Sequence, residues 1–162
     1  MKARMSREEY YLEVLEAVRK RSTCDRGMSG AILVKDGRII ATGYVGAPAG
    51  MSHCDEAGHV IEFRSSEESG RSPRFGVESK HCIRTVHAEL NAILQCAFFG
   101  VKAQGATMYC AMTPCFECAK AIVNVGIKEV IAVHPYQAQD RTIALFGHRK
   151  IPLTILSREG LY

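Results

Sequence analysis

Two short segments carry the residue types that could hold a metal ion beside a proton-transfer group. His87 and Glu89 are separated by one residue, and Cys115 and Cys118 are separated by two. Residues three apart lie on the same side of a helix, so a helix that starts here would bring both thiols together. The spacing therefore predicts one metal ion held by two thiolates and the imidazole of His87.

The residues just before the cysteines have the signals of a helix N-terminus. Pro114 suits the first helical position, and Thr113 suits the N-cap. The partial positive charge at a helix N-terminus lowers the pKa of nearby thiols. We therefore expect thiolates at this point, which is the form of cysteine that binds zinc.

The number of ligands distinguishes a catalytic zinc site from a structural one. A closed structural site has four protein ligands, whereas three ligands leave one position for water. Glu89 is near enough to His87 in the sequence to lie beside the metal without binding it. A carboxylate there could take a proton from that water and return it later, so the pattern predicts metal-assisted hydrolysis with Glu89 as the catalytic residue.

Each half of this pattern also occurs without such catalysis. A Cys-x-x-Cys pair is often a redox pair or half of a structural zinc knuckle, and His-x-Glu is common by chance. The combination in this order, with proline before the first cysteine, is more specific, and it is the signature of the zinc-dependent base deaminases.

The chain resembles the deoxycytidylate (dCMP) deaminases, a family that includes phage enzymes and bacterial late-competence deaminase-like proteins. The segments that carry the resemblance are 29–32, 37–44, 85–93, 105–109, 113–122 and 126–130. The resemblance implies zinc-dependent hydrolytic deamination of dCMP to dUMP and ammonia, a step of pyrimidine metabolism that supplies dTTP precursors. Water would attack C4 of the cytosine, while Glu89 carries protons to N3 and to the leaving amine.

The resemblance also implies substrate contacts and partners. Tyr136 resembles a family residue near the substrate phosphate or sugar, although a tyrosine that caps the sheet is an equal alternative, and Ala88 of the His-Ala-Glu motif is a further candidate contact. We expect a small-molecule nucleotide substrate, a homo-oligomer that is often a hexamer in the family, and dCTP and dTTP as allosteric effectors.

Some family members carry a further, structural zinc. Its ligands come from before the first strand, from the loop after the hairpin and from just before the His-Ala-Glu motif, and the matching residues here are Cys24, Cys54, His59 and His81. They would form a closed Cys₂His₂ site that pins an irregular loop. Cys82 or His53 could replace His59 or His81. The alternative is that Cys24 is a buried apolar residue and the histidines lie on surface loops.

Two positions depart from the family pattern, and both concern the substrate. Val45 stands where relatives have an asparagine that contacts the nucleotide, and Phe98 stands where they tend to carry a basic residue toward the phosphate. The candidates for a replacement phosphate contact are Arg84, Lys102 and Arg141. The same chemistry on a free nucleoside, a modified cytosine nucleotide or a base in RNA is therefore an alternative.

A zinc-stabilised binding module without catalysis is the second alternative. A purely structural site has no use for an adjacent carboxylate, so Glu89 argues against it. The 21 Lys and Arg and 17 Asp and Glu give a net charge of +4, which suits an anionic ligand. No block of basic residues is dense enough to indicate a nucleic-acid track, so we do not expect nucleic acid as a partner.

The elements that must position these residues follow from periodicity and turn signals. A capping box at Ser6 and Glu9 predicts a helix over about 6–21, and Asp36-Gly37 predicts a hairpin between strands 31–34 and 39–42. An irregular loop is expected at 43–58 and a charged, mobile insertion at about 62–80. Helices are expected at 87–99, 114–125 and 138–147, and strands at 107–110, 130–133 and 153–156.

This order predicts an α/β fold in which helices pack on a mixed sheet. The resemblance implies the three-layer α/β/α cytidine-deaminase-like fold with five strands. A length of 162 residues with 47% hydrophobic content suits a single domain over 1–162. Seven cysteines, an odd number, argue against a disulfide framework. We found neither a signal peptide nor an apolar run of the roughly 18 residues that a membrane span needs, so we expect a cytoplasmic protein without membrane contact.

Overall fold

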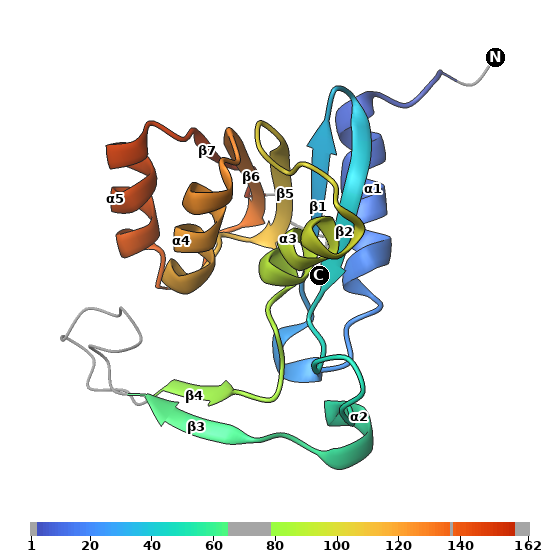
Figure 1. The fold of residues 1–162 in the computed structure, drawn as a ribbon, viewed down its shortest axis with the longest axis vertical. Coiled ribbons are helices and arrows are strands. Elements are labelled where there is room, and N and C mark those ends of the chain that lie inside the picture. Colours follow the sequence, from blue (N-terminus) through green and yellow to red (C-terminus); the bar gives the residue numbers. More distant parts are fainter. Residues whose placement is uncertain (1–2, 65–78, 137, 158–162) are drawn as a thin grey trace.

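A mixed five-stranded sheet forms the centre of the computed structural model, which describes residues 3–64, 79–136 and 138–157 (Figure 1). The strands are β1 (Gly30–Lys35), β2 (Arg38–Tyr44), β5 (Thr107–Met112), β6 (Glu129–His134) and β7 (Leu153–Ile155), in the order β2-β1-β5-β6-β7. β1 is antiparallel to both of its neighbours, whereas β5, β6 and β7 are parallel. The predicted mixed sheet is confirmed.

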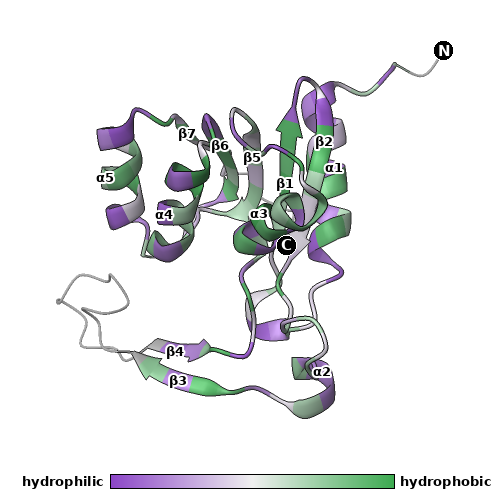
Figure 2. Cartoon of the chain, viewed as in Figure 1, coloured by the Kyte–Doolittle hydropathy of each residue, from purple (hydrophilic) through white to green (hydrophobic). Residues whose placement is uncertain are grey.

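Helices cover both faces of this sheet. The long helices are α1 (Arg7–Arg19), α3 (Ala88–Phe99), α4 (Phe116–Val125) and α5 (Asp140–Arg149). Leu15 of α1 packs with Ile32 of β1 in one core cluster, whereas Ile122 of α4 and Phe146 of α5 pack with Leu33 in the other. Because Ile32 and Leu33 point to opposite faces of β1, the chain has the expected three layers. In Figure 2 the strands of the central sheet are mostly apolar, whereas α1, α4 and α5 alternate between polar and apolar segments.

The hairpin β1–β2 forms where Asp36-Gly37 predicts it. Both residues have positive φ, 50° at Asp36 and 74° at Gly37. Two consecutive residues in the left-handed region make the tight turn whose twist matches that of the flanking strands. This hairpin provides β1 as the antiparallel partner of β5 and β2 as the edge strand.

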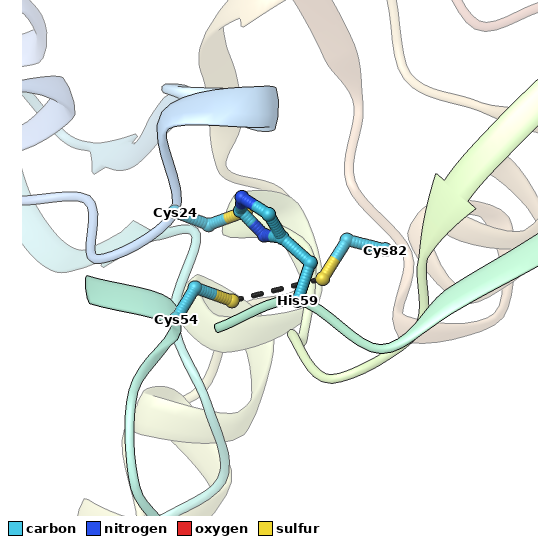
Figure 3. Close-up of side chains that lie close together, drawn as sticks. All are labelled: Cys24, Cys54, His59 and Cys82. Atoms are coloured by element: carbon cyan, nitrogen blue, oxygen red, sulfur yellow. Dashed lines mark hydrogen bonds between the residues drawn. The ribbon is translucent and has the colours of Figure 1, made fainter. Parts of the chain in front are cut away.

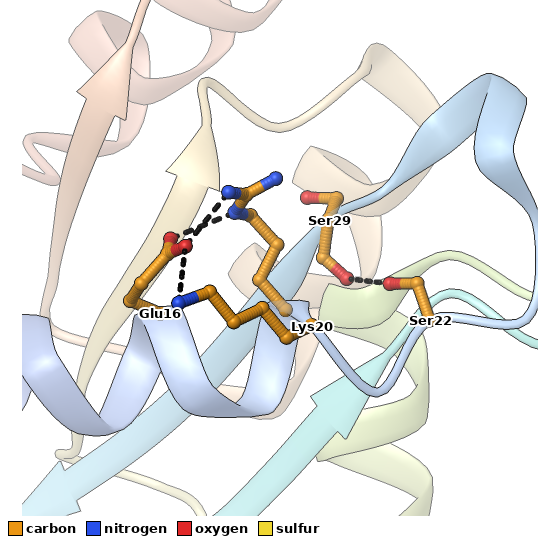
Figure 4. Close-up of polar contacts among 5 residues, drawn as sticks. Glu16, Lys20, Ser22 and Ser29 are labelled. Carbon is orange, nitrogen blue, oxygen red and sulfur yellow. Dashed lines mark hydrogen bonds and ion pairs between the residues drawn. The ribbon is translucent and has the colours of Figure 1, made fainter. Parts of the chain in front are cut away.

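The first helix begins as predicted and ends two residues earlier than expected. The Ser6 hydroxyl accepts from the Glu9 backbone N–H, and the Glu9 carboxylate accepts from the Ser6 N–H. At the other end, Glu16 forms an ion pair with Arg19 at 2.8 Å. Beyond the helix, the Ser22 hydroxyl donates to the Ser29 carbonyl at 3.0 Å, which closes the base of the loop that leads into β1 (Figure 4).

The region expected to be one charged insertion begins and ends as strand. β3 (Ile61–Arg64) and β4 (Ser79–Cys82) form a separate two-stranded antiparallel sheet, preceded by the short helix α2 (Cys54–Ala57). Residues 65–78 of the predicted insertion lie outside the described residues. The expectation of a loop over the whole of 62–80 is therefore wrong at both of its ends, where backbone pairing orders the chain.

The second half of the sheet is built from two strand–helix–strand units. β5, α4 and β6 form the first unit, and β6, α5 and β7 form the second. Gly126 ends α4 in the left-handed conformation, with φ of 80°. These units confirm the predicted alternation after residue 87. Among the described residues, none of the helices combines the length and the apolar character that crossing a bilayer requires.

Candidate active site

The three side chains predicted to share a metal ion lie together. His87 Nδ1 is 3.4 Å from the Sγ of Cys115 and 3.5 Å from the Sγ of Cys118. All three ligand atoms lie within 4.8 Å of one another. Cys118 is fully buried, whereas Cys115 is partly exposed and His87 is exposed, so the group faces outward from the core.

These distances fit a tetrahedral zinc ion. Bonds of about 2.3 Å to sulfur and about 2.1 Å to nitrogen at tetrahedral angles place neighbouring ligand atoms about 3.5–3.8 Å apart. The hydrogen bond from Cys118 lowers the pKa of the Cys115 thiol to about 4, and the same pairing raises the pKa of Cys118. The pair can therefore supply a thiolate at neutral pH before any metal arrives.

Two helix N-termini bring the ligands into place. His87 is the N-cap of α3, and Cys115, rather than Thr113, is the N-cap of α4. The capping prediction was wrong because Pro114 precedes the helix, so that its first residue is Phe116. Cys115 and Cys118 remain three residues apart at the helix start, and the predicted juxtaposition of the thiols is unaffected.

A glycine in β2 allows α3 to approach the sheet. A Cβ atom at Gly43 would lie 2.2 Å from the Ala88 carbonyl oxygen and 2.4 Å from the Ala92 nitrogen. Only glycine leaves room for backbone at that distance. Because Ala88 follows His87 and precedes Glu89, this contact sets the depth at which both functional side chains sit.

Glu89 lies beside the three ligands in a nearly enclosed position. The residue is 6% exposed, and its Oε2 accepts a hydrogen bond from the Cys118 thiol at 3.7 Å. Burial raises the pKa of the Glu89 carboxyl, an effect that the nearby His87 opposes. A carboxyl group with a raised pKa holds a proton more readily than an ordinary carboxylate, which suits it to accept and return one.

A cavity of about 480 Å³ opens onto these residues. Its walls include Glu89, His87 and Cys115, together with Tyr136 and Val45. The other predicted substrate contact, Ala88, is fully buried and is not among the described lining residues.

The basic residues at this cavity differ from those that the sequence suggested. Arg26, Lys80 and His81 line it, whereas Arg84, Lys102 and Arg141 are not among the described lining residues. The Arg84 guanidinium contacts the Ser52 carbonyl, the Lys102 carbonyl accepts from Lys35, and Arg141 lies 4.2 Å from the ring centroid of Phe116. Phe98 is 84% exposed on α3 and is likewise not among the described lining residues.

A second group of possible metal ligands lies next to the cavity. It consists of Cys24, Cys54, His59 and Cys82, which we call the loop cluster (Figure 3). The Sγ atoms of Cys54 and Cys82 are 3.6 Å apart, and Cys24 Sγ is 3.7 Å from His59 Nδ1. These separations again match the edges of a tetrahedral zinc site.

In the loop cluster, Cys82, which the sequence analysis gave as an alternative ligand, stands in place of His81. Cys82 belongs to the group and His81 does not. Successive side chains of a strand point to opposite faces, so β4 can direct only one of these two neighbours toward the other ligands. The alternative ligand His53 is also outside the group, and its Nδ1 lies 3.1 Å from the Thr23 hydroxyl.

The surroundings of the loop cluster favour the thiolate at Cys82 and fix one histidine tautomer, whereas burial raises the pKa of Cys24 and Cys54. Burial works to raise the pKa of Cys82, but hydrogen bonds from the Arg84 backbone N–H, from His59 and from the Val60 N–H bring it to about 7. His59 Nε2 lies 3.0 Å from Asp25 Oδ1, which leaves Nδ1 for the metal. A carboxylate on the outer nitrogen is the usual support of a metal-binding histidine.

Sequence reasoning missed Asp25, Arg26 and Lys80. Each is a common surface residue type, and its role depends on which loop lies next to which. One signal was present, because Asp25 and Arg26 directly follow the predicted ligand Cys24. Residues that flank a metal ligand are held in place with it, so they are candidates for the neighbouring site.

The comparisons with known proteins agree with this geometry. Residues 5–134 match the family model described as the cytidine and deoxycytidylate deaminase zinc-binding region. The chain is 38% identical over 143 residues to "ComE operon protein 2" of Bacillus subtilis (strain 168), covering 88% of this chain and 67% of that relative. It is 37% identical over 150 residues to the "Deoxycytidylate deaminase" of Enterobacteria phage T2, covering 77% of this chain and 78% of that relative.

A solved structure shares the fold over nearly the whole chain. The dCMP deaminase of cyanophage S-TIM5, in complex with dCMP and dUMP, superposes with a TM-score of 0.71 at 26% identity, covering 94% of this chain and 99% of that one. The family match spans the three ligands His87, Cys115 and Cys118 as well as Glu89. This chain belongs to the zinc-dependent cytidine and deoxycytidylate deaminase family.

Proposed function

We propose that this chain catalyses the hydrolysis of dCMP to dUMP and ammonia. The observation that carries the proposal is the buried carboxylate of Glu89 beside a three-ligand metal group, at the wall of a cavity that has basic residues around it. The names of the phage relative and of the cyanophage neighbour support the same reaction.

The residues of this chain divide the reaction between them. His87, Cys115 and Cys118 hold zinc, which when bound supplies a Lewis acid that activates water at neutral pH. Glu89 accepts a proton from the attacking water and delivers it to N3 of the cytosine. It then takes the second proton from the hydroxyl group added to C4 and transfers it to the amino group that leaves C4, so that one water is consumed and one ammonia is released. Burial keeps the carboxylate away from bulk solvent throughout.

The basic residues at the cavity support a nucleotide rather than a nucleoside. Arg26 and Lys80 provide two cationic side chains at the cavity that contains Glu89. Each charge-assisted hydrogen bond to a phosphate contributes about 1.5–3 kcal/mol. Val45, which is 6% exposed, forms an apolar part of the wall and offers no hydrogen bond to the nucleotide through its side chain. Deamination of deoxycytidine is the second candidate, and Val45 is the observation that favours it.

The proposal extends to the assembly and its setting. Leu94, Phe98 and Phe99 of α3 are exposed by 55%, 84% and 67%, and exposed apolar side chains of this kind support a homo-oligomer, whereas a hexamer is implied by the family resemblance alone. Regulation by dCTP and dTTP, a cytoplasmic location and a single domain over 1–162 stay predictions from the sequence. Oligomeric state is measured directly by light scattering.

A panel of substrates tests the proposed reaction. Ammonia release is measured with dCMP, CMP and deoxycytidine at equal concentrations. We expect kcat/KM for dCMP to exceed that for deoxycytidine by at least about 10- to 100-fold, the factor that one phosphate contact supplies. Equal values for the two would favour the nucleoside, and no ammonia from any of the three would overturn the proposed function.

A further inference from the structure

We propose that the loop cluster sets the affinity for the substrate phosphate, because it holds Arg26 and Lys80 at the cavity. The inference rests on the proposed function for the identity of the substrate. It gives the loop cluster a positioning role in binding, in addition to any contribution to overall stability.

Arg26 is tied to the loop cluster through its own backbone. Cys24 is the N-cap of a one-turn 3₁₀ helix, η1 (Asp25–Gly27), whose central residue is Arg26. The Arg26 N–H donates to the Cys24 thiol, and Asp25 contacts His59 at 3.0 Å.

The base and the tip of the loop between α1 and β1 are held by different parts of the chain. At the base, the Ser22 hydroxyl donates to Ser29, and the Thr23 N–H donates to the Val45 carbonyl at 3.0 Å. At the tip, Asp25 contacts His59 at 3.0 Å, and the Arg26 guanidinium donates to the Lys80 carbonyl at 3.3 Å. The tip of the loop therefore depends on the loop cluster and on β4.

Lys80 depends on the same four ligands. It lies two residues before Cys82 in β4, so both side chains point to the same face of the strand, and both line the cavity. Among the described strands, β4 pairs with β3 alone, and an isolated two-stranded sheet is marginally stable in water. His59 precedes β3 and Cys82 ends β4, so a shared metal ion would close the open end of this hairpin.

Arg26 and Lys80 both line the cavity, and the Lys80 ammonium also lies 5.5 Å from the ring centroid of Phe63. The guanidinium of Arg26 donates to the backbone of Lys80, which brings two like charges to one side of the cavity. A phosphate between them would accept from both side chains. If the η1 loop or β4 moved, the substrate phosphate would lose its charge-assisted contacts with Arg26 or Lys80. The cytosine base would still contact Glu89 and the three-ligand group.

The test compares ligands with and without a phosphate in a chain that cannot turn them over. Dissociation constants of dCMP, deoxycytidine and inorganic phosphate are measured by calorimetry in Glu89→Gln, alone and combined with Cys54→Ser. Cys54 is a member of the loop cluster that is not among the described lining residues. We expect the combined variant to bind about one zinc fewer per chain, to bind dCMP and phosphate at least about tenfold more weakly, and to bind deoxycytidine within about twofold of the parent.

Two further variants keep the test decisive. Cys96→Ser makes the same change at a buried thiol of α3 outside both groups, so equal weakening of dCMP there would assign the effect to general destabilisation and overturn the proposal. If Cys54→Ser does not fold, Asp25→Asn loosens His59 instead, with Asp36→Asn in the β1–β2 turn as its control.

The outcomes separate this inference from the proposed function. Unchanged binding of dCMP and phosphate after loss of the second zinc would overturn the inference, as would an equal weakening of dCMP and deoxycytidine. If the unsubstituted chain did not release ammonia from dCMP, the proposed function alone would be overturned. The measurements of inorganic phosphate binding would still report on Arg26 and Lys80.

Discussion

The two groups of cysteine and histidine differ in how their ligands are supported. Cys115 and His87 are N-caps of helices that pack on the central sheet, so the fold itself brings the three ligands together. The loop cluster draws its four ligands from a loop, a short helix and the ends of a two-stranded hairpin. The first group is therefore preorganised by the core, whereas the second organises segments that have little core of their own.

The carboxylate beside each group shows the same contrast. Glu89 is 6% exposed and lies next to a group that has an open ligand position, which suits proton transfer. The Asp25 side chain is 83% exposed and contacts His59 of a group with four ligands, which suits orientation of a ligand. Burial and ligand number together distinguish a group that reacts from a group that holds the chain in place.

Glu89→Gln is expected to have the largest effect, a loss of kcat, and it tests whether the three-ligand group is the one that reacts. The amide has nearly the shape of the carboxylate but cannot accept the proton, and general acid–base catalysis contributes about 10²- to 10⁴-fold. We expect kcat for dCMP to fall by that factor while the zinc content and the melting temperature stay near the parent values. Ammonia release and metal analysis of the same sample measure both quantities.

A matched control for this change lies in the first turn of α4. Glu117 occupies an exposed position there, paired with Lys120, as Glu89 occupies the first turn of α3. Glu117→Gln should leave kcat within about twofold of the parent, because surface ion pairs contribute little. Comparable losses in both variants would mean that charge at a helix start, rather than proton transfer, explains the result.

Gly43→Ala gives the next effect and tests whether the core preorganises the first group. The new methyl group would meet the backbone of Ala88 and Ala92, which cannot rotate away, and overpacking costs about 1–3 kcal/mol or somewhat more. We expect the free energy of unfolding to fall by that amount, and kcat to fall because α3 carries Glu89. Urea unfolding and ammonia release check the two expectations.

The same substitution at Gly147 should have the opposite sign. Gly147 lies within α5, and a Cβ atom there would meet nothing within 4 Å. Alanine in a helix interior is favoured over glycine by about 1 kcal/mol, so Gly147→Ala should stabilise the chain without changing kcat. If Gly43→Ala were as harmless as Gly147→Ala, the close approach of α3 to β2 would not control the site.

The first group could be predicted from the sequence because its geometry is local. The spacing of Cys115 and Cys118 on a helix fixes the two thiols, and one long-range contact, to His87, completes the set. The strand–helix alternation was similarly predictable, since hydrophobic periodicity reports directly on buried faces. The resemblance to a known family supplied the remaining step from a zinc site to a reaction on cytosine.

The loop cluster shows where prediction from sequence ends. His81 and Cys82 are neighbours, and the choice between them depends on which face of β4 meets Cys24 and Cys54. A four-residue strand beside charged residues carries no clear alternation from which to read that face. The contribution of Arg26 and Lys80 to the cavity depends on the same packing, so it became visible only with the structure.

Glu16→Gln gives the smallest expected effect and tests whether the end of α1 contributes to either group. A hydrogen bond from Arg19 lowers the pKa of Glu16, against the opposing effect of burial. The unfolded chain therefore binds a proton at Glu16 more readily than the folded chain does. The Glu16 carboxylate stabilises the folded chain at pH values above about 4.5, its pKa in the unfolded chain, and this stabilisation is lost as the pH falls through its lower pKa in the folded chain.

We expect Glu16→Gln to reduce the free energy of unfolding by about 0.5–1 kcal/mol at pH 7, and by less as the pH falls below 4.5, the ordinary pKa of this carboxyl. Urea unfolding at several pH values measures this difference, and Glu13→Gln, an exposed position on the same helix, is the control.

The zinc content and the dCMP affinity of Glu16→Gln should be unchanged, because the Ser22–Ser29 contact, rather than the ion pair, closes the base of the loop that contains Cys24. A loss of dCMP affinity in this variant would show that the loop depends on α1, and the contrast between a preorganised group and an organising one would then weaken.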